Sequence, residues 1–234
     1  MNQIEFKNEL KLMNIEPTEF HLEQLQKYYN LVIESNKVMN LTGITEENEF
    51  YLKHFYDSLT LNKVIDLSKI ESLCDLGSGA GFPGIVLKII FPAINITLVD
   101  SLTKRTDFLN CVIKNLNLEG INVINSRIED YSRINREKFD IVTARAVTNN
   151  QILLEIGSPL VKVGGSFVSM KGKDEEDIKN LGNTLKELNL SFRCKESFLL
   201  PIEKSERTLL EFKKEKATNI KYPRTFDKIK KRPL

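Results

Sequence analysis

The spacing of apolar residues along the chain changes once, near residue 70. Upstream of it, apolar side chains recur every three or four positions, as in an amphipathic helix: Leu25, Tyr28, Tyr29, Val32 and Ile33. Pro17-Thr18 suits the start of this helix, and a second helix is predicted over Glu47 to Leu61. We therefore predict a helical N-terminal extension over residues 1–65.

From residue 72, short β-rich runs alternate with amphipathic segments. The predicted strands are Ser72–Leu76, Asn95–Asp100, Ile121–Asn125 and Phe139–Thr143. The predicted helices are Gly84–Phe91, Thr103–Leu116 and Gln151–Val161. Strands that alternate with helices imply right-handed crossovers and a doubly wound parallel sheet, so residues 66–215 are predicted to form one α/β domain.

The last part of this domain predicts a different strand pairing. Gly164-Gly165 lead into a fifth strand, SFVSMKG, and a charged helix is predicted over Asp174–Leu188. Ser191–Leu200 and Arg207–Lys214 follow with only a short link between them, which favours an antiparallel hairpin at the sheet edge. Dinucleotide-dependent dehydrogenases add a second, substrate domain, and no residues remain here for one.

Charge is distributed unevenly along the 234 residues, whose formal net charge is only +2. Residues 1–70 carry a net charge of −4, whereas residues 213–234 carry +7. A basic tail, taken as residues 216–234, indicates an anionic partner, although a flexible, solvated terminus would have the same composition. Nothing in the pattern indicates a large exposed interface, so we expect a monomer.

The distribution of cysteines and apolar residues indicates a cytoplasmic protein. The three cysteines are far apart and form no C-x-x-C pair, so neither disulfides nor a metal site is expected. The N-terminus lacks the layout of a signal peptide, and no run of eighteen apolar residues exists to span a membrane.

The stretch CDLGSGAGFPG contains the pattern G-x-G-x-x-G at Gly79, Gly81 and Gly84. Such a turn before a helix can hold a dinucleotide or another anionic ligand. Asp100 ends the next predicted strand, where its carboxylate can accept both hydroxyls of a ribose, whether of NAD or of S-adenosylmethionine. Asp75 favours S-adenosylmethionine over NAD, because a carboxylate at this position would repel the pyrophosphate of NAD and attract the sulfonium of S-adenosylmethionine. An alternative role for Asp75 is to bond backbone N–H groups of the turn.

Two further segments are expected at the same end of the sheet. Ser126 to Glu129 follow the third strand, where an apolar residue can cover an adenine and an acidic one can bind its edge. Arg145 follows the fourth strand and could bind the carboxylate of the cofactor or a substrate phosphate. The alternatives are a helix cap for Asp100 and a surface salt bridge for Arg145.

Several catalytic devices are missing from the expected site. The fourth strand ends in TARA, without the D/N-P-P-Y/F clamp of exocyclic-amine methylation. Methylation of a pyrimidine carbon needs a cysteine nucleophile, and oxygen methylation usually needs a base. The cysteines are expected elsewhere, and the two histidines, His21 and His54, lie in the extension. Guanine N7 needs none of these devices, because its lone pair is already nucleophilic.

The chain resembles the bacterial RsmG (GidB) family along almost its whole length. The resemblance rests on NKVMNLTGIT and KHFYDSL in the extension, and on DLGSGAGFPGIVL, LVDSLTKRTDFL, SRIED and FDIVTARAV in the α/β domain. MKGKDEEDI and YPR extend it toward the C-terminus. The family methylates N7 of a guanine in 16S ribosomal RNA.

The resemblance implies a class I, Rossmann-like methyltransferase: a doubly wound, mostly parallel seven-stranded sheet with an antiparallel last strand. Its cofactor would be S-adenosylmethionine and its partner 16S ribosomal RNA, in the small subunit or its precursor. Expected cofactor contacts are Gly77, Gly79, Phe82, Asp100, Ile128, Glu129 and Arg145. Expected RNA contacts are Lys104, Arg105, Lys171, Lys173 and Arg224. No residue is a certain catalyst, although Arg145 is a candidate. A methyltransferase with another substrate and an NAD-binding redox protein remain alternatives.

Overall fold

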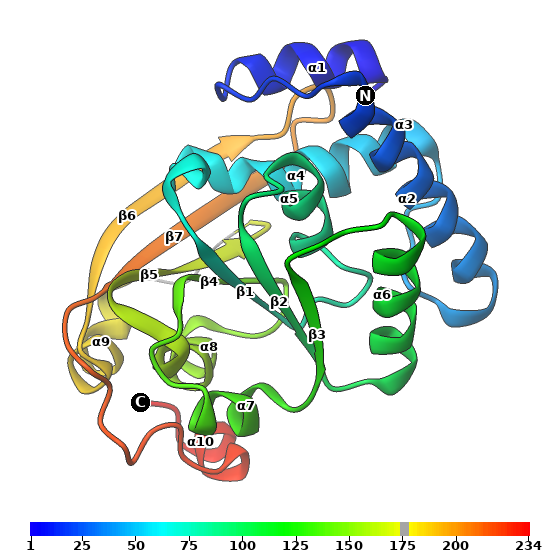
Figure 1. Ribbon diagram of the computed structural model, residues 1–234. Coiled ribbons are helices and arrows are strands. Elements are labelled where there is room, and N and C mark those ends of the chain that lie inside the picture. The colour runs from blue at the N-terminus through cyan, green and yellow to red at the C-terminus, as the bar shows by residue number, and fades with distance from the viewer. Residues whose placement is uncertain (174–177) are drawn as a thin grey trace.

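Seven strands form a single twisted sheet in a computed structural model that describes residues 1–173 and 178–234 (Figure 1). The strands are β1 Ser72–Leu76, β2 Asn95–Asp100, β3 Ile121–Asn125, β4 Phe139–Arg145, β5 Val161–Lys171, β6 Leu190–Leu199 and β7 Glu206–Lys214. Their order is β3-β2-β1-β4-β5-β7-β6, and β7 alone runs in the direction opposite to the other six. The doubly wound sheet with a late antiparallel hairpin is therefore confirmed.

Helices cover both faces of this sheet. They are α5 Gly84–Ile90, α6 Thr103–Asn115, α7 Ile128–Ile134, α8 Asn150–Gly157, α9 Gly182–Leu188 and α10 Phe226–Lys231. One face packs α5 and α6 against residues such as Leu73 and Leu98, and the other packs α8 and α9 against Leu76 and Val142. Because parallel strands are buried on both faces, they need apolar residues at every position, which explains why their sequences read as continuous apolar runs.

Several predicted boundaries differ from the structure, most of them by one or two residues. The helix predicted to reach Val161 ends at Gly157, and a single 3-10 turn, Ser158–Leu160, leads into β5. Strand β5 begins five residues before the predicted SFVSMKG, and α7 was not predicted. The first four residues of the predicted helix Asp174–Leu188 lie outside the described residues. The remainder is a 3-10 turn, Ile178–Leu181, followed by α9.

The N-terminal extension is helical, as predicted. It contains α1 Gln3–Lys11, α2 Glu19–Met39, and a continuous helical stretch of α3 Glu47–Phe50, a π-helical segment Tyr51–Tyr56, α4 Asp57–Leu59 and a 3-10 turn Thr60–Lys63. Thr18 caps α2 by accepting a hydrogen bond from the His21 N–H at 3.2 Å. Buried residues of the extension, among them Tyr28 and Phe55, belong to the same hydrophobic cluster as Ile85 and Leu98. The extension thus shares one core with the sheet.

The basic C-terminal segment folds back onto the α/β domain. The Arg136 guanidinium donates to the backbone carbonyls of Tyr222 at 2.8 Å and Thr218 at 2.5 Å. Tyr222 and Ile229 are buried, and α10 packs beside α7 and α8 (Figure 1). A flexible, solvated terminus is therefore not what the structure shows. Among the described residues, no helix is long and apolar enough to cross a membrane.

Candidate functional site

A cavity of about 550 Å³ lies at the carboxyl ends of the first four strands. Its wall contains Gly77 after β1, Asp100 at the end of β2, Ile128 and Glu129 after β3, and Arg145 at the end of β4. In doubly wound sheets this edge is where ligands bind, and the volume suits a small molecule. Five of the seven predicted cofactor residues, together with Arg105, thus share one cavity.

Asp100 organises the turn beside this cavity. It is 3% exposed, and its Oδ2 accepts a hydrogen bond from the Gly79 N–H while its Oδ1 accepts one from the Leu102 N–H, both at 2.9 Å. The Arg105 guanidinium lies 3.6 Å from Oδ2. Gly79 itself is not in the cavity wall, so the structure connects it to the site through Asp100. A carboxylate accepts about four hydrogen bonds, so Asp100 retains capacity for hydroxyl donors such as those of a ribose.

The remaining wall suits an adenosine-containing cofactor. Ile128 and Leu102 supply apolar surface, and Glu129, at 9% exposure, supplies an acidic group beside them. Apolar faces with a few placed polar groups are typical of sites for small ligands. The chemistry of the wall therefore fits S-adenosylmethionine.

The glycine turn does not present the phosphate cradle of a dinucleotide site. The Gly84 N–H, at the start of α5, donates to Asp75 Oδ2 at 3.0 Å. A Cβ atom on Gly84 would lie 2.2 Å from a Leu98 methyl, and one on Gly81 would lie 2.6 Å from the Tyr28 hydroxyl. These two glycines are therefore required for close packing with β2 and α2. Because protein groups already cover the start of α5, the geometry argues against NAD.

Asp75 is not in the cavity wall, although we expected it there because it lies at the end of β1. It is fully buried, and no described residue bonds its Oδ1. Burial raises the pKa of this carboxyl to about 6, and the hydrogen bond from Gly84 opposes the shift. The structure thus supports the alternative role, in which Asp75 binds a backbone N–H of the turn.

Phe82 also lies outside the cavity wall. It is 6% exposed, and its ring stacks on the His54 imidazole with the ring centroids 4.4 Å apart and the planes 7° apart. It also packs against the rings of Tyr28, Phe50 and Phe55. These contacts come from the helical extension, and the family likeness of GFPG did not reveal them. The cofactor contact of Phe82 stays a prediction, since the contacts of its ring in this structure are with the extension.

Arg145 joins the cavity to the helical extension. Its guanidinium donates to Asp57 Oδ2 at 3.0 Å and to the Lys53 carbonyl at 3.1 Å, and it lies 5.1 Å from the centroid of the Phe82 ring. The Arg207 Nε donates to the other Asp57 oxygen at 2.8 Å. Arg145 therefore forms the salt bridge that was its alternative role, but a partly buried one at the edge of the site.

His54 is held as a neutral ring by the same contacts. Its Nδ1 lies 3.2 Å from the Arg145 guanidinium, which can only donate, and its Nε2 lies 2.8 Å from the Thr42 hydroxyl. The proton of the neutral ring is thus on Nε2. Burial, aided by the positive charge of Arg145, lowers the pKa of His54 to about 3. A histidine with so low a pKa is a poor general base.

A second cavity, of about 360 Å³, shares Arg145 and Ala146 with the first. Asp57, Lys171 and Arg207 contribute to its wall, which combines the extension with the ends of β5 and β7. Sequence reasoning did not single out Asp57 or Arg207. KHFYDSL was a motif signal for Asp57, but no local pattern connects it to an arginine 150 positions away.

The predicted RNA contacts lie in different environments. Lys104 is exposed on α6, Arg105 lines the first cavity, and the Lys171 Nζ donates to the Thr148 carbonyl. Lys173 is exposed after β5. Arg224, in contrast, forms a two-point ion pair with the buried Glu155, with distances of 2.8 Å from Nε to Oε1 and 2.6 Å from NH2 to Oε2. Its guanidinium is thus engaged in structure, which leaves the predicted RNA contact without support.

Among the described residues, no cysteine lines the first cavity, and Cys74 is buried in β1, where burial raises the pKa of its thiol. The described residues contain no cluster of acidic, histidine and cysteine side chains that could hold a metal ion.

Comparison with solved structures shows the fold. A SAM-dependent methyltransferase from Aquifex aeolicus is similar with a TM-score of 0.52 at 15% identity, covering 71% of this chain and 93% of that one. A putative methyltransferase from Bacillus halodurans gives a TM-score of 0.53 at 13% identity, covering 68% and 99% of the two chains. The sheet and its helices are therefore those of the Rossmann-like methyltransferases.

Comparison with sequences gives the family. The family model described as rRNA small subunit methyltransferase G matches residues 21–209. The protein of that name from Exiguobacterium sibiricum is 43% identical, with both chains fully covered. The one from Acholeplasma laidlawii is 44% identical over 95% of this chain and 96% of its own. The chain therefore belongs to the rRNA small subunit methyltransferase G family.

Proposed function

We propose that this methyltransferase transfers the methyl group of S-adenosylmethionine to N7 of a guanine in 16S ribosomal RNA, within the small subunit or its precursor. The observation that carries this proposal is the cavity at the ends of β1 to β4, where Asp100 holds the turn, in a chain of this family. The protein would act in the cytoplasm, as a monomer.

The side chains around the two cavities support an acceptor that needs no deprotonation. His54 is neutral, with its Nδ1 engaged by Arg145, and its pKa of about 3 makes it unsuited to remove a proton. The described wall contains no cysteine for covalent catalysis at a pyrimidine carbon. Guanine N7 has a free lone pair, so orientation is the main requirement.

Each part of the site then has a positioning role. Bound S-adenosylmethionine supplies an electrophilic methyl group. Asp100 would accept hydrogen bonds from the ribose hydroxyls, and Ile128 and Glu129 would contact the adenine. Arg145 lines both the cofactor cavity and the second cavity. We place the acceptor base in the second cavity. Orientation of two reactants can lower a barrier by about 7–11 kcal/mol in favourable intramolecular cases.

The test uses labelled S-adenosylmethionine and small ribosomal subunits from a strain that lacks the gene. We expect label on one guanine of 16S ribosomal RNA, recovered as 7-methylguanosine after digestion. Label on another nucleotide would contradict the assigned acceptor, and label absent from RNA would contradict the RNA substrate.

The cofactor assignment has its own test, which needs no RNA. Asp100→Ala should weaken binding of S-adenosylmethionine, since it removes the acceptor for the ribose and the hydrogen bond to Gly79. Asp107→Ala, an exposed carboxylate on α6, is the matched control. Equal affinity of both variants would refute the role of Asp100, and saturable binding of NADH would favour the redox alternative.

A further inference from the structure

The C-terminal helix contributes an aromatic ring to the cofactor cavity. Phe226, the first residue of α10, lines the cavity together with Ile128 and Ile156 and is 38% exposed. The basic composition of residues 216–234 had indicated an anionic partner for this segment. The position of the ring at the cavity connects it to the cofactor.

An apolar cluster holds α10 in this position. Ile229, one turn after Phe226, is fully buried and packs with Ile152 and Ile156 of α8. Ile128, the residue after β3 that we expect against the adenine, packs against the same cluster. Residues three apart on a helix lie on one face, so the face of α10 that buries Ile229 also presents Phe226.

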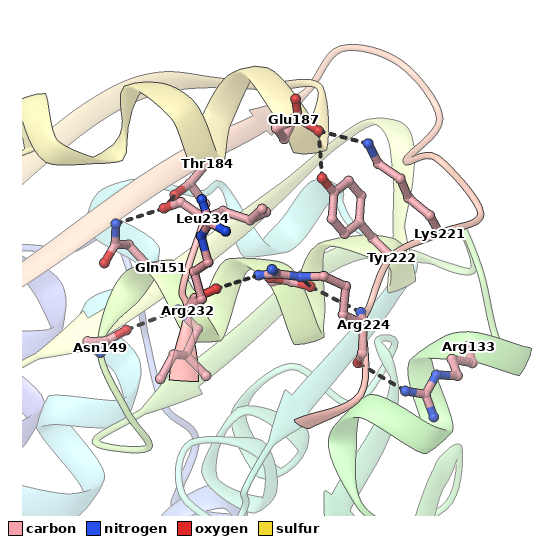
Figure 2. Close-up of polar contacts among 12 residues, drawn as sticks. Arg133, Asn149, Gln151, Thr184, Glu187, Lys221, Tyr222, Arg224, Arg232 and Leu234 are labelled. Carbon is pink, nitrogen blue, oxygen red and sulfur yellow. Dashed lines mark hydrogen bonds and ion pairs between the residues drawn. The ribbon is translucent and has the colours of Figure 1, made fainter. Parts of the chain in front are cut away.

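Polar contacts fix the segment on both sides of α10 (Figure 2). Before the helix, Arg224 pairs with Glu155, and Arg133 donates to the Arg224 carbonyl at 2.9 Å. After it, the Leu234 carbonyl accepts hydrogen bonds from the Gln151 amide and the Thr184 hydroxyl, both at 2.8 Å. A ring held by an anchored backbone loses little conformational freedom on binding a ligand.

We propose that α10 is part of the cofactor site and that the Phe226 ring covers the adenine of S-adenosylmethionine. The proposal rests on the cofactor assigned above. With the ribose at Asp100 at the end of β2, the base lies toward the outer strand β3, whose loop carries Ile128 and Glu129. Phe226 belongs to this end of the cavity, because its helix packs against Ile128. An aromatic ring stacks on a purine in such positions.

Calorimetric titration of the full-length protein with S-adenosylhomocysteine tests this role. We expect Phe226→Ala to weaken binding about tenfold, which corresponds to about 1.4 kcal/mol. Phe226→Leu, which keeps apolar cover without the ring, should weaken it about threefold. Ile220→Ala is the matched control, because Ile220 is 81% exposed in the same segment and outside the cavity wall.

The outcomes separate this inference from the proposed function. Wild-type affinity in both Phe226 variants, with unchanged thermal unfolding, would overturn the role of Phe226 while leaving the cofactor in place. If the Phe226 variants bind small subunits more weakly but keep their affinity for S-adenosylhomocysteine, the ring contacts RNA, and its role at the adenine is overturned as well. A wild-type protein that binds no S-adenosylhomocysteine would overturn the proposed function itself, and this inference with it. If Phe226→Ala unfolds, Phe226→Leu decides alone.

Discussion

The ion pair between Arg224 and Glu155 makes a quantitative prediction about the C-terminal segment. The Glu155 side chain has no exposed surface, whereas that of Arg224 is 24% exposed. Three N–H groups of Arg224 donate to this carboxylate: the backbone N–H at 3.0 Å, Nε at 2.8 Å and NH2 at 2.6 Å. Arg224→Ala removes two of the three and leaves a buried negative charge with a single donor from residue 224.

Leaving one partner of a buried ion pair without the other costs about 3–5 kcal/mol. The free energy of unfolding of a globular domain is about 5–15 kcal/mol. We therefore expect Arg224→Ala to remove a large share of the stability. Urea unfolding, followed by circular dichroism, measures the change. Lys37→Ala is the matched control, because its ion pair with Glu34 is exposed and worth under about 1 kcal/mol.

The double variant Glu155→Leu with Arg224→Leu checks the physical cause. Replacing a buried pair by apolar residues of similar volume is often close to neutral, so the double variant should recover most of the loss. If it is as unstable as Arg224→Ala, or if Arg224→Ala loses less than about 1 kcal/mol, the unpaired charge is not the cause. An Arg224→Ala variant that keeps its stability and instead loses affinity for small subunits would restore Arg224 as an RNA contact.

Three further predictions concern the turn and the basic surface. The pKa of Asp75 is raised from an ordinary 3.8 to about 6 in the folded state. Between about pH 4 and pH 6 the folded protein therefore keeps a proton on Asp75 that the unfolded chain has released, and the free energy of unfolding falls as the pH rises through this range. The free energy of unfolding of Asp75→Asn, measured with urea, should therefore exceed that of the wild type by up to about 3 kcal/mol at pH 8 and by little at pH 4. An equal difference at both pH values would contradict the idea that a buried negative charge on Asp75 destabilises the folded state. Gly81→Ala should destabilise by about 1–3 kcal/mol, since its Cβ would lie 2.6 Å from the Tyr28 hydroxyl, and a neutral thermal unfolding result would refute this. Lys230→Gln with Lys231→Gln, both exposed on α10, should reduce the salt dependence of small-subunit binding without changing cofactor affinity; an unchanged salt slope would show that this face does not meet RNA.

Local patterns in the sequence predicted most of the sheet. The first three strands begin and end at the predicted residues, because buried parallel strands are short apolar runs bounded by turns. The hairpin of β6 and β7 followed from two apolar runs with a short link. The boundary between α8 and β5 was wrong because the prediction continued the helix through Gly157-Ser158-Pro159, a turn signal that the structure places before β5.

The candidate site was predictable where it depends on topology. Asp100, Ile128 and Glu129 follow strand ends, and parallel strands bring their carboxyl ends to one edge. Phe82 and Arg224 were different, since each is engaged by a residue distant in sequence. A glycine turn does not reveal that an aromatic ring from α2 covers it, and a basic tail does not reveal that one of its arginines is paired with a buried glutamate.

The packing at the start of α5 has a consequence for how this chain distinguishes two related cofactors. Tyr28 donates a hydrogen bond to the Ala80 carbonyl at 2.5 Å and lies where a side chain on Gly81 would be. Together with the Asp75 carboxylate on the Gly84 N–H, it covers the turn before α5, the position at which such folds bind a dinucleotide phosphate. We therefore expect neutralisation of Asp75 alone not to admit a dinucleotide, because Tyr28 of the helical extension would still cover the turn.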